Sequence, residues 1–346
     1  MKLHTCGTIG LVPHNPLADA DPAVKVGSVH HIVPRFYLRR FADERERITV
    51  VDRVTGQRRD VHVDQAHRQR DFYTFVNTDG ESDGRVEQLL EQVEGQAATA
   101  LRNTFQTVFG RWPPMGEHRL ELIQFVAFQY LRGRRHRRQM EMMADFAFRL
   151  ELSQVTKANV RDFLRGRGVE PTSEAVGEAL TVLADLDDIE VAPQNNHYIE
   201  SMLRAFPRML PILAQRRMSL VQWEEPRLVT CDEPVLLLPW PDTQGRGVGI
   251  QTAMEVWMPL DPRRLLVLAH ERVGSPEVVV SGEDVSELIE SINMGIIANS
   301  HECVFMTPGT KFPGSSYVPG EQPIMSISGG LGGLDLARAF HGLLVV

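Results

Sequence analysis

Two adjacent histidines, His30 and His31, are the first side chains in the sequence that could do chemistry. Imidazole nitrogens can bind a metal ion, and near neutral pH they can act as a general base. Pro34 follows at a spacing that favours a helix start, because proline is well tolerated in the first helical turn. The pattern predicts a short helix directly after the histidines. It makes both histidines candidate metal ligands and His31 a candidate catalytic base.

The same segment is similar to the opening of the His-Asn-His nuclease motif, in which one histidine activates water and a neighbour binds a metal ion. That motif requires an asparagine and a further histidine on a short helix downstream. The nearest downstream histidines, His62 and His67, fall on a predicted strand and a predicted loop instead. A catalytic role for His31 therefore has an equal alternative. In this second interpretation His31 hydrogen-bonds the following helix, and the aromatic residues of that helix belong to the core.

Three glutamates, Glu87, Glu91 and Glu94, lie on a predicted helix at spacings that place them on one face. Paired inward carboxylates could bind a metal ion or act as acid and base. The alternative is a solvated face, which is common for glutamate. Glu87 and Glu94 are candidate metal ligands, and Glu94 is also a candidate catalytic residue. Because no Glu-x-x-His motif accompanies them, a di-iron carboxylate bundle is not predicted.

The densest basic stretch runs from Arg132 to Arg138. Gln129, Arg132 and His136 recur at spacings of three and four residues, so they share one helix face. Turned inward, this stripe could hold a phosphate or a carboxylate through a bidentate guanidinium group. Gln129 and Arg132 are therefore candidate catalytic residues, with Arg132 as an anion clamp. The other arginines are predicted to be solvated, or to form a dimer or anion surface.

Asp232 follows a predicted strand and stands two residues before Pro234. Acidic residues at strand ends are frequent in functional sites, so Asp232 could ligate a metal ion or orient a histidine. An equal alternative is that it only caps the turn before the proline. His197, near the start of another predicted helix, is a third histidine candidate for a metal site, although it could also be a helix cap.

Hydrophobic periodicity predicts the elements that must position these residues. A β-hairpin is predicted over 48–63, and helices over 85–109, 117–150, 153–165, 173–186 and 196–217, the last kinked or split at its prolines. Short strands follow at 218–222, 227–230, 235–238, 256–258, 265–269 and 303–306, with one more helix over 281–299. Because helices and strands are clustered rather than alternating, the pattern favours an α+β fold.

We expect three parts that together make one compact unit. They are an extended arm over 1–28, the histidine segment with the hairpin and helical body over 29–217, and a β-rich part with one helix over 218–346. The β-rich part is expected to pack on the helices.

Composition narrows the class of protein. The chain has 346 residues with a formal net charge of −8, which argues against general binding to duplex DNA or to an anionic membrane surface. In addition, no aromatic residues interleave with the basic stretch, so nucleic acid is not a predicted partner. The three cysteines are widely spaced and form no CxxC pair, which predicts neither a zinc ribbon nor a disulfide framework. With no secretory signal pattern and no apolar run of membrane-spanning length, we expect a cytoplasmic protein.

Residues spread through the chain carry a family resemblance. They are His31, Pro34, Phe36, Tyr37, Leu38, Phe41, Asp71 to Thr74, Glu87, Glu94, Gln129, Arg132, His197, Tyr198, Trp223, Thr230 to Val235, Pro259, Leu260 and Asn293. In these residues the chain resembles the uncharacterised, mainly bacterial family catalogued as domain of unknown function 4238. That family often reads Ser-Asp-Asn-Pro where this chain has Cys231 to Pro234, so a chemical role for the asparagine would not carry over to Glu233. The resemblance implies the extent of the domain and no mechanism.

We expect an intracellular enzyme that hydrolyses a small molecule or a peptide in a polar cleft, with a divalent metal ion as the cofactor such residues would hold. Its catalytic residues would be His31, Glu94, Gln129, Arg132 and Asp232. Its metal ligands would come from His30, His31, Glu87, Glu94, His197 and Asp232. Two alternatives stay open: a non-catalytic binding module in which these residues form a buried polar network, and a tailoring enzyme acting on a small metabolite or peptide. The sequence leaves the reaction, the metal and the oligomeric state open, a homodimer included.

Overall fold

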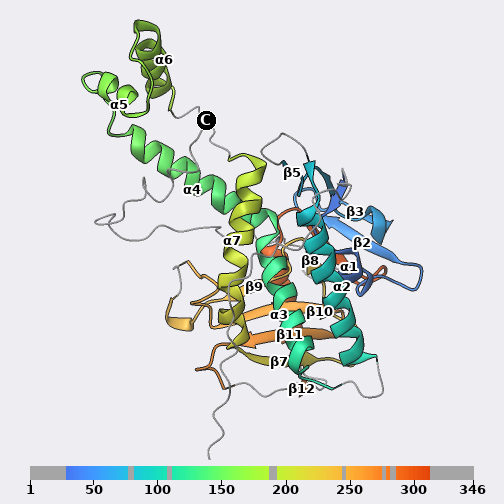
Figure 1. Ribbon diagram of the computed structural model, residues 1–346. Coiled ribbons are helices and arrows are strands. Elements are labelled where there is room, and N and C mark those ends of the chain that lie inside the picture. Colours follow the sequence, from blue (N-terminus) through green and yellow to red (C-terminus); the bar gives the residue numbers. More distant parts are fainter. Residues whose placement is uncertain are drawn as a thin grey trace, which may run out of the picture. The chain divides into compact units, whose positions relative to one another are not determined.

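The computed structural model describes residues 29–76, 82–106, 111–186, 193–243, 247–274, 278–280 and 286–311. They form the predicted α+β fold (Figure 1). The chain divides into two units, one with the described residues up to Gly133 and from Ile199 onward, and one with Arg134 to Tyr198. The predicted N-terminal arm, 1–28, lies outside the described residues.

The first unit opens with short strands around one short helix. In order these elements are β1 (Val29–His31), α1 (Arg35–Arg39), β2 (Arg47–Asp52), β3 (Arg58–His62), the 3-10 turn η1 (Val63–Gln65), β4 (Arg68–Arg70), β5 (Phe75–Val76) and β6 (Ser82–Asp83). The predicted hairpin is confirmed as the antiparallel pair β2 and β3. Strand β1 pairs with β4, so His31 lies opposite Arg68. This pairing places the predicted histidine segment beside Arg68 to Arg70, a strand that the sequence pattern did not predict.

The later strands of the first unit build two larger sheets. They are β7 (Arg217–Gln222), β8 (Thr230–Cys231), β9 (Leu236–Leu238), β10 (Glu255–Asp261), β11 (Arg264–Ala269), β12 (Val278–Val280) and β13 (Cys303–Met306), with a 3-10 turn, η3 (Pro241–Thr243), after β9. One sheet has the order β12-β7-β11-β10-β9, and the other has the order β3-β2-β13-β8. Strand β13 therefore joins the N-terminal hairpin to β8, whose end carries Asp232.

The continuous apolar run of β11 is explained by burial on both faces of its sheet. Successive side chains of a strand point to opposite faces. Leu266 and Leu268 belong to one hydrophobic cluster, together with residues of α2 (Arg85–Phe105), α3 (Gly116–Leu131) and the later part of α7 (Asn195–Ala214). The intervening Leu265 and Val267 belong to a second cluster, together with isoleucines of α8 (Ser286–Asn299). The sheet is thus covered on both faces, which is why its strands read as apolar runs rather than as an alternation.

Helices α2 and α3 pack on one another in the first unit (Figure 1). Helix α2 buries a stripe at helical spacing that consists of Val86, Leu90, Val93, Ala97 and Leu101. Helix α3 is buried over most of its second half, which explains why its apolar residues are less strictly periodic. Among the described residues, none of the helices combines the length and the hydropathy needed to cross a membrane.

The predicted long helix over 117–150 is wrong, because the chain breaks it at Arg132 and Gly133. Helix α3 ends at Leu131, and α4 (Arg134–Leu152) begins after the break. At Gly133 a Cβ atom would lie within 3.0 Å of both carboxylate oxygens of Glu233. A Cβ here would require the Glu233 carboxylate to shift, so a contact from a distant part of the sequence accompanies the interruption of the helix.

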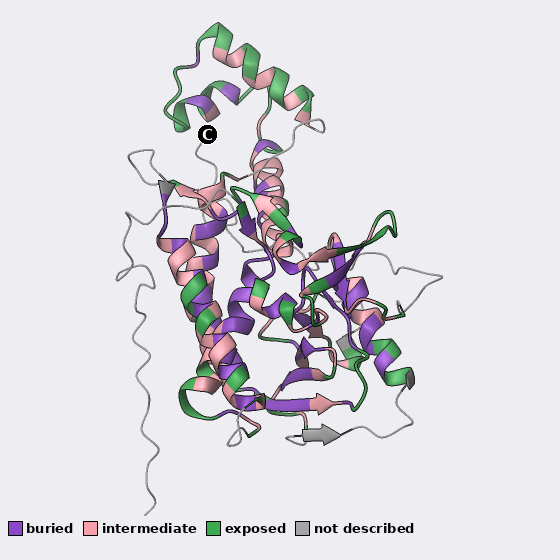
Figure 2. Cartoon of the chain, turned by 90° about the vertical axis from the view of Figure 1, so that its right-hand side faces the viewer, coloured by how far each residue is buried: buried purple, intermediate pink, exposed green. Residues whose placement is uncertain are grey.

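The second unit is mostly helical. It contains α4, α5 (Val160–Gly166), α6 (Ser173–Ala184) and the start of α7. Thr172 caps α6, since its hydroxyl accepts the N–H of Ala175 at 3.1 Å. No residue of α6 is buried, and Figure 2 colours it green and pink along its length. The split predicted for the helix over 196–217 is wrong, because α7 is one continuous element that contains Pro207 and Pro211, and the predicted kink stays a prediction.

Candidate functional site

Five of the predicted site residues come together around Arg132, and with Tyr73 they form a group that we call the Arg132 network. Its members are His30, His31, Tyr73, Glu87, Glu94 and Arg132. The pairing of β1 with β4 and the packing of α1 and α3 against α2 bring them together. Tyr73 follows β4, the glutamates lie on α2, and Arg132 stands at the end of α3.

Arg132 is held on three sides by protein groups. Its guanidinium donates to Glu94 at 2.5 Å, to the backbone carbonyl of His31 at 2.8 Å, and to the Tyr73 hydroxyl at 3.1 Å. Burial alone would lower the pKa of Arg132, but the nearby Tyr73 and Glu94 more than offset this and raise the pKa above its usual value. Arg132 therefore stays charged and ties three segments together. An anion clamp at this residue would have to displace one of these bonds.

His30 uses both of its ring nitrogens within the Arg132 network. The backbone N–H of Tyr73 donates to His30 Nδ1 at 3.1 Å. Nε2 therefore carries the proton of the neutral ring and donates to Glu87 at 2.6 Å. A metal ion at His30 would have to replace one of these two hydrogen bonds.

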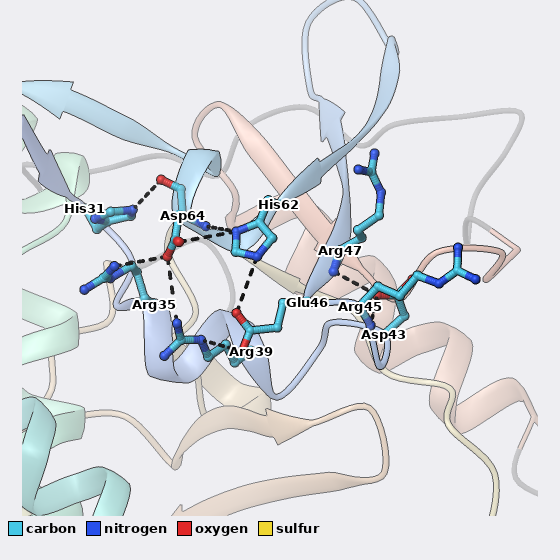
Figure 3. Close-up of polar contacts among 9 residues, drawn as sticks. All are labelled: His31, Arg35, Arg39, Asp43, Arg45, Glu46, Arg47, His62 and Asp64. Atoms are coloured by element: carbon cyan, nitrogen blue, oxygen red, sulfur yellow. Dashed lines mark hydrogen bonds and ion pairs between the residues drawn. The ribbon is translucent and has the colours of Figure 1, made fainter.

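His31 turns its ring toward the 3-10 turn that precedes β4. Its Nε2 donates to the backbone carbonyl of Asp64 at 3.1 Å. Burial lowers the pKa of His31, and the nearby Arg35 acts in the same direction. Figure 3 shows this ring at the edge of a surface network in which the Asp64 carboxylate contacts Arg35, Arg39 and His62. The ring thus links β1 to the 3-10 turn, whereas the second interpretation placed its hydrogen bond on the following helix.

Among the described residues, no hydrogen bond joins the side chain of Gln129 or His197 to the Arg132 network. Gln129 is 1% exposed, and within the described part of the chain neither of its amide atoms has a hydrogen-bond partner. His197 lies in the second unit, at the start of α7. Its backbone N–H donates to the Gln194 carbonyl at 3.0 Å.

Asp232, the last predicted site residue, is 2% exposed and sits where β8 ends. Its carboxylate accepts three backbone N–H groups, from His301 at 2.8 Å, from Glu302 at 2.6 Å and from Cys303 at 3.1 Å. Burial raises the pKa of Asp232 in spite of these bonds. Asp232 therefore anchors the segment that leads into β13, which the sequence had not indicated.

Sequence reasoning missed the two residues that accompany Asp232. His67 Nε2 lies 4.0 Å from Asp232 Oδ2. One ligand atom each from His67, Asp232 and Glu302 lie within 4.8 Å of one another, and we call these three residues the His67 cluster. The sequence pattern placed His67 on a predicted loop rather than on the short helix that the nuclease motif requires, so it was not a candidate. Glu302 directly precedes the last predicted strand, so the strand-end rule that singled out Asp232 would have found it too.

The backbone of His67 is itself unusual. Its φ angle is +45°, a left-handed conformation that is uncommon outside glycine. The ring packs edge-on against Phe305, with 5.8 Å between ring centroids. Non-glycine residues in this region persist where surrounding structure holds them, and they concentrate at functional sites. The conformation therefore makes His67 a stronger candidate than its sequence position suggested.

The His67 cluster borders a surface cleft of about 680 Å³. His67 and Glu302 line it, and so do the exposed guanidinium-bearing residues Arg59 and Arg68. The remaining lining residues are Val29, Asp52, Val54, Gln65 and Cys303. Burial raises the pKa of Cys303 to about 12, so this thiol stays protonated and is not a nucleophile. The cleft combines metal-ligating side chains with cationic side chains.

The Arg132 network and the His67 cluster are neighbours in the fold. The backbone N–H of Ile32 donates to the His67 carbonyl at 3.4 Å, directly after His31. A second contact joins the residues that directly follow Arg132 and Asp232 in the sequence. Gly133 lies against the carboxylate of Glu233. The chain thus brings residues from both ends of the sequence to one region of the first unit.

Fold and site together define an α+β protein with a buried histidine and two acidic residues at the edge of a cleft. The chain belongs to the family described as Protein of unknown function (DUF4238), whose family model matches residues 29–310. The resemblance seen in the sequence is thereby confirmed. No curated protein and no solved structure matches the chain.

Proposed function

We propose that this protein is a metal-assisted hydrolase whose site is the His67 cluster. The observation that carries the proposal is the convergence of His67, Asp232 and Glu302 within 4.8 Å at the edge of a cleft. One ion with metal–ligand bonds of about 2.0–2.4 Å can reach three ligand atoms at such separations. This moves the expected metal site from the Arg132 network, where protein groups already occupy the polar atoms of His30 and Arg132.

The three side chains would leave coordination positions open. Catalytic metal sites characteristically keep such a position for water, and the bound ion lowers the pKa of that water to about 7. The resulting hydroxide would attack the carbonyl carbon or phosphorus of an ester. The bond to the leaving oxygen would break, and that oxygen would take up a proton. Asp232 is held by three backbone N–H groups, so it would position the ion without needing to move.

The substrate we propose is an anionic ester, with a phosphate ester as the first class to test. Arg59 and Arg68 line the same cleft as His67, and guanidinium groups bind phosphate and carboxylate oxygens well. The cationic side chains would hold the charged group while the metal-bound water attacks. A cytoplasmic location belongs to the same proposal, because Cys231 and Cys303 are buried free thiols, which suit a reducing compartment.

Metal binding is the first test. The purified chain would be stripped with EDTA and titrated with Mn²⁺, Zn²⁺ and Mg²⁺ by calorimetry. His67→Gln and Glu302→Gln should each weaken binding of the preferred ion by about tenfold or more, because each removes one ligand. His62→Gln and Glu44→Gln are matched controls in the same part of the fold, outside the cleft, and should bind the ion like the unaltered chain.

Hydrolysis is the second test. With the preferred ion, the protein should hydrolyse bis(p-nitrophenyl) phosphate or p-nitrophenyl phosphate faster than the neutral p-nitrophenyl acetate. Equal metal affinity in the cluster variants and the control variants would contradict the proposed site. Specific metal binding without hydrolysis of any of the three esters would instead favour the non-catalytic binding module, in which the ion fixes the fold or a partner surface.

A further inference from the structure

A second cleft in the first unit is lined by arginines. Its volume is about 670 Å³, and its walls come from α1, α2 and the turn between β10 and β11. It is distinct from the cleft at His67, because no residue lines both clefts. The charged residues of this arginine cleft are Arg39, Arg40, Arg102, Asp261, Arg263 and Arg264.

Two of these arginines share a single carboxylate. Arg40 and Arg264 both donate to Oδ2 of Asp261, at 2.9 and 2.8 Å. One negative charge therefore serves two guanidinium groups that lie side by side. Burial lowers the pKa of Arg40, Asp261 opposes this, and the neighbouring Arg264 reinforces it. An additional anion at this point would stabilise both cations.

Further positive charge in the arginine cleft is not neutralised. Both Arg102 and Arg263 are exposed, and neither has a carboxylate partner among the described residues. Arg39 differs, because Glu46 and Asp64 lie 3.3 and 3.9 Å from its guanidinium (Figure 3). Arg39 is neutralised, and Asp261 offsets one of the four remaining arginines. The net charge of the cleft is therefore about three positive charges.

The guanidinium groups are held in place by an aromatic ring. Arg264 lies 4.4 Å from the centroid of the Phe105 ring, and Arg40 lies 6.0 Å from the same centroid. Within the described part of the chain, Arg264 Nε is buried and has no hydrogen-bond partner. A buried donor without a partner is costly, which leaves part of the hydrogen-bonding capacity of this guanidinium unused by the protein.

We propose that the arginine cleft binds a phosphate-bearing small molecule through a diphosphate or similarly polyvalent phosphate group. Several positive charges in one cleft favour a polyvalent anion over a single carboxylate, and guanidinium forks match phosphate oxygens. The whole chain has a net charge of −8, so local positive charge such as that of the arginine cleft is needed to attract an anion. This inference is independent of the metal-assisted hydrolysis proposed at His67.

Pyrophosphate is the probe for the test, and calorimetry with the full chain at low ionic strength is the measurement. EDTA is kept in the buffer, so that the result does not depend on a metal at the His67 cluster. The double variant Arg102→Gln/Arg263→Gln removes two exposed cations that make no ion pair with any residue the structure describes. We expect it to raise the Kd for pyrophosphate by about tenfold or more.

Two further double variants are matched controls. Arg45→Gln/Arg208→Gln removes two exposed arginines outside both clefts, and we expect it to change the Kd by about twofold at most. Arg59→Gln/Arg68→Gln removes the cations of the His67 cleft and reports any pyrophosphate held there; it should leave the binding that Arg102→Gln/Arg263→Gln weakens unchanged within about twofold. An equal loss in all three variants would overturn the proposal, because it would show diffuse attraction. A loss confined to Arg59→Gln/Arg68→Gln would overturn it too, and so would the absence of pyrophosphate binding or an equal affinity for citrate.

Discussion

The Arg132 network and the His67 cluster are two polar groups of the same unit with opposite surroundings. Arg132 is 5% exposed, and protein atoms of Glu94, His31 and Tyr73 meet it on three sides. The His67 cluster borders a cleft of about 680 Å³ that also carries cationic side chains. Conspicuous buried charge therefore does not by itself mark a reactive site. A network filled by protein groups stabilises the fold, whereas ligand-type side chains beside open volume can act on another molecule.

Removing the central cation would break this comparison most sharply. Arg132→Met leaves Glu94 and the His31 carbonyl without their buried donor, so we expect a loss of about 3–5 kcal/mol in the free energy of unfolding. Urea denaturation of the variant and of the unaltered chain measures it. Arg208→Met, at an exposed arginine on α7, is the control and should stay within about 0.5 kcal/mol. A loss at Arg132 no larger than at Arg208 would mean that the network does not hold the fold.

Gly133 tests the contact that connects the two groups. In Gly133→Ala the new Cβ would overlap the Glu233 carboxylate, so we expect a loss of about 1–3 kcal/mol in the free energy of unfolding. Gly95→Ala is the matched control, because nothing lies within 4 Å of a Cβ added at Gly95 on exposed α2 surface. That change should stabilise the protein by about 0.5–1 kcal/mol. The same sign in both variants would contradict the close approach to Glu233.

His31 gives the network a pH dependence. Its pKa is lowered in the fold, so the unfolded chain binds more protons as the pH falls below about 6.5. The stability from this residue is complete above that pH and is lost as the pH falls toward the lowered pKa. In denaturation at pH 7 and pH 5.5, His31→Gln should reduce the difference between the two free energies of unfolding. A pH dependence that His31→Gln leaves unchanged would contradict this assignment.

The smallest effect on stability is expected in the cleft. Glu302→Gln keeps the size of a side chain that lines open volume, so the free energy of unfolding should change by about 0.5 kcal/mol or less. Thermal unfolding without metal measures this, and the metal titration described above measures the loss of binding. If Glu302→Gln caused a large loss of stability and no loss of metal binding, the His67 cluster would be a group that stabilises the fold, like the Arg132 network.

The outline of the fold could be read from the sequence because it depends on local periodicity. The apolar stripe of α2 and the short strand signals after Met218 predicted the α+β class and most element positions. Breaks caused by distant contacts could not be read in this way. The pattern over 117–150 is helical throughout, and nothing near Gly133 in the sequence indicates that Glu233 approaches it.

The candidate site divides in the same way. Residue types alone drew attention to His30, Glu94, Arg132 and Asp232, and four other positions with them. Their grouping was not visible, because hydrogen-bond partners and burial arise only when distant segments pack. Strand pairing decided the grouping. The pairing of β1 with β4 and of β8 with β13 accompanies the approach of His67 to Asp232 and Glu302.

By itself, the sequence determined the family and the α+β class of this protein, and it supplied the side chains that could do chemistry. Periodicity and residue type are local properties, so they can be read from the sequence without knowledge of the fold. Only the tertiary structure decided that Arg132 is enclosed by protein while His67 and Glu302 border a cleft. Enclosure and exposure depend on contacts between segments far apart in the chain, and those contacts are fixed by packing rather than by spacing.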